Sequence, residues 1–201
     1  MTQISIHKTP ENLLPYEGEA YYFPDFFDPE KSQYFFQNLK ENIHWKQEPI
    51  KIFGKEVLQP RLTALYGNPE IPYSYSGIRM QAQPFNEALN NIKNRIEQVA
   101  KVDFTHVLLN YYRHGQDSMG WHRDNEKELG PNPVIGSISF GAKRKFHFRH
   151  YRDKRTKVTL DLQHGSFLLM AGATQHHWEH QVPKTRQKLG ERINLTFRVI
   201  R

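Results

Sequence analysis

Three side chains of the kinds that bind divalent metals stand out in the C-terminal half of the sequence. His122 and Asp124 form a His-x-Asp pair, and in an extended segment residues at i and i+2 project from one face, so both can reach one ion. His180 follows in the strand-like segment HHWEHQV. The chain has no cysteine, so any metal site in it must use histidine and carboxylate. These residues predict one divalent metal site.

The third ligand and the metal both have competitors. The chain holds 11 histidines, so a His-x-Asp tripeptide can arise by chance. On a strand His176 and His180 would share a face while His177 points away, which disfavours His177 and leaves the other two open. Two histidines and a carboxylate leave free positions on an octahedral ion, as in non-haem Fe(II) oxygenases. The same set can also hold zinc in a hydrolase.

A second constellation lies in the segment Arg192 to Arg198, where polar and apolar residues alternate. Ile193, Leu195 and Phe197 would enter the core, and the other strand face would carry two guanidinium groups, an amide and a hydroxyl. An arginine binds a carboxylate through two hydrogen bonds, and 2-oxoglutarate has a carboxylate at each end. This pattern favours an oxygenase, because a zinc hydrolase would not need such an anion clamp. A simply solvated polar face is the common alternative for an alternating strand.

The elements that must position these residues are two helices followed by strands. A helix is predicted to begin at Asp28-Pro29 and to bury Phe35, Phe36, Leu39 and Ile43, and a second to run from about Pro84 to Ala100. From His106 onward the chain reads as short strands separated by turn residues, namely HVLLNYY, VIGSISFG, KFHFRHY, KVTLDL, GSFLLMAG, HHWEHQV and RINLTFRVI. We therefore expect an α+β fold, with two N-terminal helices packed on one sheet of a jelly roll (double-stranded β-helix).

Length and charge limit the class of protein. A chain of 201 residues fits one domain, 1–201. Lysine and arginine number 28 against 21 acidic residues, a net charge of +7 that favours a polyanionic partner such as nucleic acid or an acidic membrane surface. No apolar run approaches the roughly 18 to 20 residues that span a bilayer, and the first residues lack a signal pattern. We expect a soluble intracellular protein, cytoplasmic or, in a eukaryote, nuclear.

Four segments together resemble the AlkB-like nucleic-acid dealkylases, closest to the members that repair duplex DNA. They are NYY at 110–112, HRDNEKEL at 122–129, SFGAKRKFHFRH at 139–150 and RINLTFR at 192–198, within a match over roughly residues 50 to 200. The resemblance implies Fe(II) held by His122, Asp124 and His180, which decides between His176 and His180. It implies that O2 and 2-oxoglutarate are cosubstrates, with 2-oxoglutarate held by Asn110, Tyr112, Arg192, Asn194, Thr196 and Arg198. Arg192 with Tyr112 and Thr196 would hold the distal carboxylate, and Arg198 with Asn110 the end near the metal.

The resemblance also implies a reaction and its substrate contacts. An N-methyl group of 1-methyladenine or 3-methylcytosine in DNA would be oxidised, releasing formaldehyde, succinate and CO2. Residues 1–105 would carry the helices and a nucleotide-recognition lid, and 106–201 the jelly-roll catalytic core. We expect a monomer that acts on double- and single-stranded DNA and binds no membrane. The expected contacts are Tyr73 and Tyr75 on the extruded base, Glu126 at the base edge, Phe53 as a wedge in the duplex, and Arg61 with basic residues between Lys143 and Lys157 on phosphates.

Other functions remain open at this point. An oxygenase with the same chemistry could act on RNA, on a protein or on a small molecule. A DNA-binding module without catalysis is an alternative from another class. Because every ligand position is filled, a decayed catalytic site is the less favoured interpretation.

Overall fold

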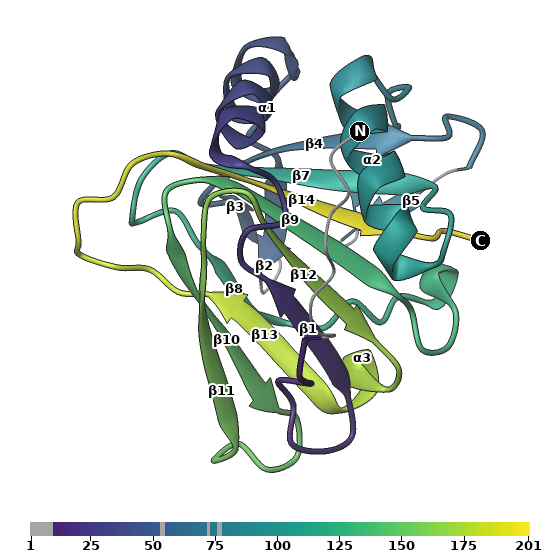
Figure 1. The fold of residues 1–201 in the computed structure, drawn as a ribbon, viewed down its shortest axis with the longest axis vertical. Helices are drawn as coiled ribbons and strands as arrows, with labels where there is room; N and C mark the ends of the chain where they lie inside the picture. The colour runs from purple at the N-terminus through teal and green to yellow at the C-terminus, as the bar shows by residue number, and fades with distance from the viewer. Residues whose placement is uncertain (1–9, 53–54, 72, 76–77) are drawn as a thin grey trace.

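The computed structural model describes residues 10–52, 55–71, 73–75 and 78–201, and gives only the backbone for 50–52, 55, 73–75 and 78–80. Two antiparallel sheets face each other (Figure 1). The six-stranded sheet has the order β1 (Glu19–Phe23), β12 (Ser166–Ala171), β9 (Ile135–Gly141), β14 (Arg192–Arg198), β7 (His106–Tyr112), β4 (Leu62–Gly67). The four-stranded sheet has the order β11 (Lys157–Leu162), β10 (Arg144–His150), β13 (Trp178–Val182), β8 (Met119–His122).

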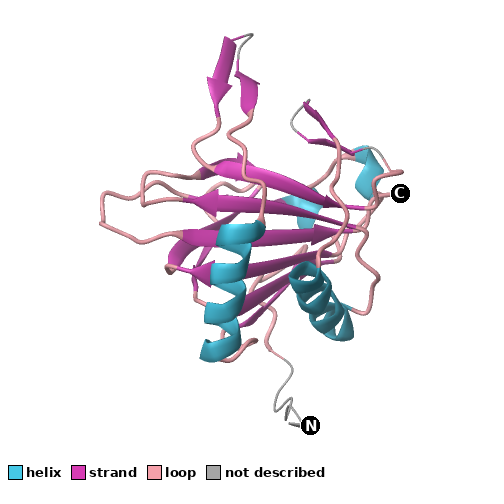
Figure 2. Ribbon diagram, turned by 90° about the horizontal axis from the view of Figure 1, so that it is seen from above, coloured by secondary structure: helices cyan, strands magenta, loops and turns pink. Residues whose placement is uncertain are grey.

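Two helices cover the outer face of the six-stranded sheet, α1 (Pro29–Asn42) and α2 (Glu87–Ala100), as Figure 2 shows from above. The capping residues explain where they begin. Asp28 accepts a hydrogen bond from Lys31 N at 2.8 Å, and Asn86 accepts one from Leu89 N at 2.9 Å. The cap at Asn86 places the start of α2 three residues beyond Pro84. The α+β jelly roll with two helices on one sheet is thus confirmed.

The six-stranded sheet is buried on both faces, so both sets of side chains on its inner strands face a core or a pocket. Side chains such as Leu39 of α1, Ile96 of α2 and Leu195 of β14 form one core between the helices and the sheet. A second core between the two sheets contains Phe148 and Trp178. Because every residue of β14 is buried, the polar half of its alternation faces the second sheet instead of solvent.

Two short hairpins extend from the β4 edge of the molecule (Figure 2). They are β2 (Pro49–Ile52) with β3 (Lys55–Leu58), and β5 (Tyr73–Tyr75) with β6 (Ile78–Met80). Strands of the first 105 residues also complete the large sheet, since β1 pairs with β12 and β4 with β7. Among the described residues, no helix is both long and apolar enough to cross a membrane.

One local prediction was wrong. The segment HHWEHQV is not a strand throughout, because its first two residues belong to a short helix, α3 (Thr174–His177), and β13 begins at Trp178. The hydroxyl of Thr174 receives Glu19 N–H at 2.8 Å and donates to Ala171 O at 2.6 Å, which fixes this helical turn. His176 and His180 therefore do not share a strand face. A further short 3₁₀ turn covers Lys127–Leu129.

Candidate metal centre and anion pocket

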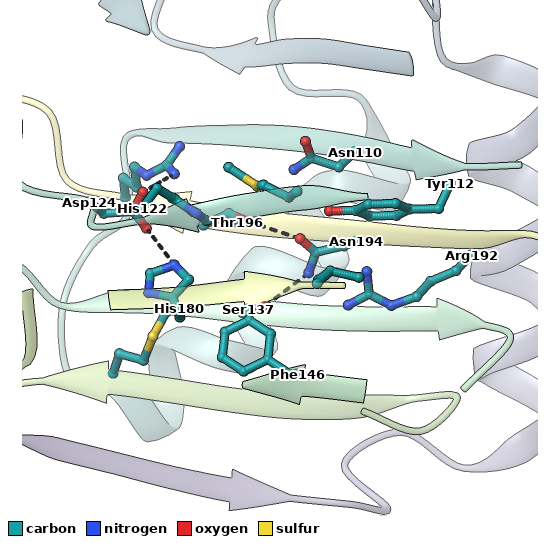
Figure 3. A pocket seen from close by; sticks show the side chains of 14 residues that line it. Asn110, Tyr112, His122, Asp124, Ser137, Phe146, His180, Arg192, Asn194 and Thr196 are labelled. Carbon is teal, nitrogen blue, oxygen red and sulfur yellow. Dashed lines mark hydrogen bonds and ion pairs between the residues drawn. The ribbon is translucent and has the colours of Figure 1, made fainter. Parts of the chain in front are cut away.

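His122, Asp124 and His180 come together between the two sheets (Figure 3). His122 of β8 and His180 of β13 are direct neighbours across the antiparallel pair, with ring centroids 4.2 Å apart. Asp124 lies just beyond the end of β8, and its Oδ2 is 4.0 Å from His180 Nε2. The ligand atoms of all three lie within 4.8 Å of one another. This separation suits one metal ion.

Neighbouring groups orient each of the three side chains. His122 Nδ1 lies 2.8 Å from Gly120 O, and a proton on Nδ1 donated to that carbonyl leaves Nε2 free to bind a metal. His180 is fixed by packing, stacked on Phe146 with centroids 5.3 Å apart. Asp124 Oδ1 accepts a 2.7 Å hydrogen bond from Arg198 Nη2. The donor set is therefore preorganised.

The electrostatics of the three residues favour the protonation states that a metal requires. Burial, together with the nearby His122, lowers the pKa of His180 to about 3. Burial also lowers the pKa of His122. For Asp124 burial alone would raise the pKa, but Arg198 and the two histidines hold it at about 2. Near neutral pH both imidazoles are uncharged and the carboxylate is ionised.

A buried arginine, Arg192, lies at the other end of the same pocket (Figure 3). Arg192 is 1% exposed and donates through Nη2 to Ser139 Oγ at 2.8 Å. Its Nε and Nη1 are buried and have no hydrogen-bond partner among the described residues. The guanidinium lies over the Tyr112 ring, 5.1 Å from its centroid. Burial lowers its pKa to about 10, so the group stays charged near neutral pH and offers two N–H donors to an anion.

The polar face of β14 between Arg192 and Arg198 forms an ordered hydrogen-bond row. Asn194 donates to Ser137 Oγ and to Ile138 O, both at 2.9 Å, and its Oδ1 accepts from Thr196 Oγ1 at 3.2 Å. Across the pocket wall Asn110 Oδ1 accepts from Arg61 Nε at 2.7 Å. This leaves the amide nitrogen of Asn110 as the group available to a ligand.

Arg198 and Arg61 have roles that the sequence did not indicate. Arg198 is ion-paired with Asp124, so one of the two inward guanidinium groups already faces a carboxylate of the protein. Arg61 is 5% exposed and donates to Asn110 and to Ser118 O, so it is not available to a phosphate at the surface. The prediction that Arg61 contacts DNA phosphates was therefore wrong, because its side chain is buried and bonded to Asn110 and Ser118.

The expected basic surface is also smaller than the sequence suggested. Arg144 is 2% exposed, and its Nη2 donates to the carbonyls of Asp117 and Pro183, each at 2.8 Å. Its expected phosphate contact was therefore wrong. Arg149 and Lys154 both pair with Glu179, which neutralises part of the remaining charge.

The other expected substrate contacts are only partly described. Phe53 lies outside the described residues, and of Tyr73 and Tyr75 only the backbone in β5 is described. Glu126 is half-buried, and its Oε2 accepts no hydrogen bond from the described residues. Burial raises the pKa of Glu126, and the negative charge of Asp124 raises it further. Glu126 is thus a carboxylate near the candidate metal ligand Asp124, with an acceptor oxygen that no described residue uses.

A second cluster of metal-binding residue types, Glu17, His150 and His177, does not have the protonation that a metal needs. Asp153 N–H donates to His150 Nδ1 at 3.0 Å, so the proton of a neutral ring sits on Nε2. That Nε2 lies 2.9 Å from Glu17 Oε2 and donates to it. The cluster is a hydrogen-bonded contact that joins the segment before β1 to β10.

Sequence reasoning missed the residues that support the site. Ser137 and Ser139 of β9 hold Asn194 and Arg192, and Gln175 of α3 accepts a hydrogen bond from Asp124 N at 2.9 Å. The serines fall every second residue inside a run that otherwise reads as apolar, which is the one signal that could have indicated them.

Comparison with known proteins agrees with this geometry. The family model described as the 2OG-Fe(II) oxygenase superfamily matches residues 19–198. The chain is 40% identical over 189 residues to human alpha-ketoglutarate-dependent dioxygenase alkB homolog 3, covering 89% of this chain and 65% of that protein. It is 36% identical over 195 residues to mouse DNA oxidative demethylase ALKBH2, covering 92% and 81%. The chain thus spans just under two thirds of the length of the first of these relatives.

Solved structures share the fold at low sequence identity. OsALKBH1 superposes with a TM-score of 0.64 at 17% identity, covering 89% of this chain and 97% of that one. A prolyl hydroxylase from Trichoplax adhaerens, in complex with a hypoxia inducible factor peptide, gives 0.62 at 13% identity, covering 90% and 83%. From the family match and the extent of the relatives' identity, the chain belongs to the 2OG-Fe(II) oxygenase superfamily and, within it, to the AlkB-like proteins.

Proposed function

We propose that the chain is an Fe(II)- and 2-oxoglutarate-dependent dioxygenase that removes N-linked methyl groups from DNA bases. The observation that carries the proposal is the pocket itself, with a two-histidine, one-carboxylate group at one end and the two unpaired donors of Arg192 at the other. Two relatives are named as a DNA oxidative demethylase and an alpha-ketoglutarate-dependent dioxygenase, which supports the same activity here.

His122, Asp124 and His180 would hold Fe(II), and the residues present fit that ion. Two neutral imidazoles and one carboxylate leave free coordination positions for a chelating cosubstrate and for oxygen. Bound iron with 2-oxoglutarate and O2 supplies the oxidation of a methyl C–H bond, yielding succinate and CO2. The ion pair with Arg198 keeps Asp124 in the ionised form that a metal would require.

Arg192 would bind the distal carboxylate of 2-oxoglutarate. Its two buried donors have no partner in the described structure, which is costly unless an anion joins them. Tyr112 lies under the guanidinium, and Thr196 and Asn194 extend from there toward the metal end. Asn110, turned by Arg61, would donate its amide to the end of the cosubstrate near the metal.

The substrate would be a methylated base extruded from DNA, such as 1-methyladenine or 3-methylcytosine. Hydroxylation of the N-methyl carbon gives an N-hydroxymethyl group, whose C–N bond breaks to release formaldehyde and the repaired base. The free carboxylate oxygen of Glu126 supports a contact with a cationic methylated base. We assign base contacts to Tyr73 and Tyr75 and the duplex wedge to Phe53, and we expect a monomer that accepts double- and single-stranded DNA through a lid within residues 1–105.

The test uses the iron-loaded full chain with 2-oxoglutarate and methylated oligonucleotides, single- and double-stranded, and with methylated RNA of the same sequence. Formaldehyde, succinate and the restored base are measured together. Equal amounts of all three on DNA support the proposal. Turnover confined to RNA would assign another nucleic acid, succinate without base repair would assign another substrate, and binding without turnover would identify a silent DNA-binding module.

A further inference from the structure

Asp124 needs support that the two histidines do not. His122 and His180 sit on paired strands, whereas Asp124 follows the end of β8 in a segment without regular structure. Its side chain is fixed by Arg198, but this contact does not fix the backbone from which the carboxylate projects. A ligand on an irregular segment is imprecise unless other groups hold that segment.

Gln175 supplies this support. Its side chain is fully buried, and its Oε1 accepts a hydrogen bond from Asp124 N at 2.9 Å. The orientation of the amide follows from its neighbours, because a backbone N–H can only be met by the carbonyl oxygen. The Nε2 group then faces the sulfur of Met170 at 3.6 Å, a weak acceptor. The strong hydrogen bond of this buried side chain is the one to the backbone of Asp124.

The helical turn that carries Gln175 is itself fixed. Thr174, also fully buried, connects α3 to the backbone of β1 through Glu19 and to the end of β12 through Ala171. Through Gln175 and its neighbour Thr174, the backbone of Asp124 is therefore connected to two strands of the six-stranded sheet, although Asp124 lies 51 residues before Gln175 in the chain. A residue placed only to fill space would need no acceptor at this point.

We propose that Gln175 is a positioning residue that holds Asp124 in the geometry required for divalent metal binding. The proposal rests on the proposed metal site of His122, Asp124 and His180. It concerns Gln175, which would not itself bind the metal. Groups that orient metal ligands from the layer behind them commonly change metal affinity by about 10- to 100-fold when removed. Replacement of Gln175 by methionine keeps length and apolar volume while removing the acceptor.

The experiment measures Mn(II) binding to the full chain without 2-oxoglutarate or DNA, by the EPR signal of the free ion, for wild type, Gln175→Met and Gln175→Glu. Gln59→Met is the matched control, because Gln59 is 2% exposed and its Oε1 accepts no hydrogen bond from the described residues. We expect Gln175→Met to raise the Kd for Mn(II) by about 10- to 100-fold. Gln175→Glu, which keeps an acceptor oxygen, should recover most of the affinity, and Gln59→Met should bind as wild type does.

Thermal unfolding of the metal-free proteins separates positioning from general stability. If Gln175→Met binds Mn(II) as wild type does, or if Gln175→Glu binds as weakly as Gln175→Met, the positioning role is refuted. Equal losses of affinity in Gln175→Met and Gln59→Met, in step with equal losses of Tm, would also refute it. Failure of the wild-type chain to bind Mn(II) would instead refute the metal triad.

Discussion

Replacing Arg192 with methionine is expected to weaken 2-oxoglutarate binding strongly and to stabilise the ligand-free protein. Arg192 is almost completely buried, and within the described residues its guanidinium has one hydrogen-bond acceptor, Ser139 Oγ. Two of its nitrogen atoms are buried without a partner. A carboxylate would satisfy both at once, since the guanidinium fork matches a carboxylate in geometry.

The magnitude follows from these two donors. A hydrogen bond between charged partners contributes about 1.5 to 3 kcal/mol, so two contribute about 3 to 6 kcal/mol. At about 1.4 kcal/mol for each tenfold change, Arg192→Met should raise the Kd for 2-oxoglutarate by a factor on the order of 100 to 20,000. In the ligand-free protein, removal of a buried charge with unpaired donors should raise the free energy of unfolding by about 1 to 3 kcal/mol.

Arg144→Met is the matched control, because Arg144 is equally buried but its guanidinium donates to backbone carbonyls. Its loss leaves those carbonyls unsatisfied, so the free energy of unfolding should fall by about 2 to 4 kcal/mol. Isothermal titration of 2-oxoglutarate into the Mn(II)-loaded protein and urea unfolding of the metal-free protein give both quantities. A change in affinity below tenfold, or destabilisation by Arg192→Met as large as that by Arg144→Met, would refute the assignment.

Three further predictions concern other parts of the molecule. Asp124→Ala should abolish Mn(II) binding and turnover, and wild-type turnover in this variant would overturn the metal centre. Phe53→Ala should lower activity on duplex DNA more than on single strands, and equal losses would contradict the wedge. Burial alone would raise the pKa of Asp117, but Arg113 lowers it below 3.8. The stability difference between wild type and Asp117→Asn, measured in urea, should therefore be full at pH 7 and shrink as the pH falls through that lowered pKa.

Local patterns in the sequence predicted the elements whose signals are local. The cap at Asp28 was predicted, and the apolar residues of both helices recur at helical spacing. The cap at Asn86 was not predicted, and the second helix begins at Glu87, three residues after Pro84. The alternation in Arg192 to Arg198 also separated core residues from pocket residues correctly, because a strand has a period of two whatever it pairs with.

The support of the site could not be predicted, since it depends on partners that are distant in sequence. Nothing near Gln175 indicates that its amide reaches Asp124, and nothing near Arg61 indicates that it turns Asn110. The prediction that His176 lies on a strand, on the same face as His180, was wrong. The hydroxyl of Thr174 fixes a helical turn at this point, where the sequence pattern alone favoured a strand.

The pairing of Arg198 with Asp124 changes the electrostatic argument for the cosubstrate. The sequence suggested that both inward-facing arginines of β14 bind carboxylates of 2-oxoglutarate, but Arg198 already pairs with the carboxylate of Asp124. Arg192 and Arg61 are also buried around the pocket. The buried positive charges there therefore still outnumber the single negative charge of Asp124. Such a site favours a dianion, and because opposite charges attract, iron and 2-oxoglutarate should each strengthen the binding of the other. The positive excess is thus an argument for a doubly charged cosubstrate that does not depend on any single contact.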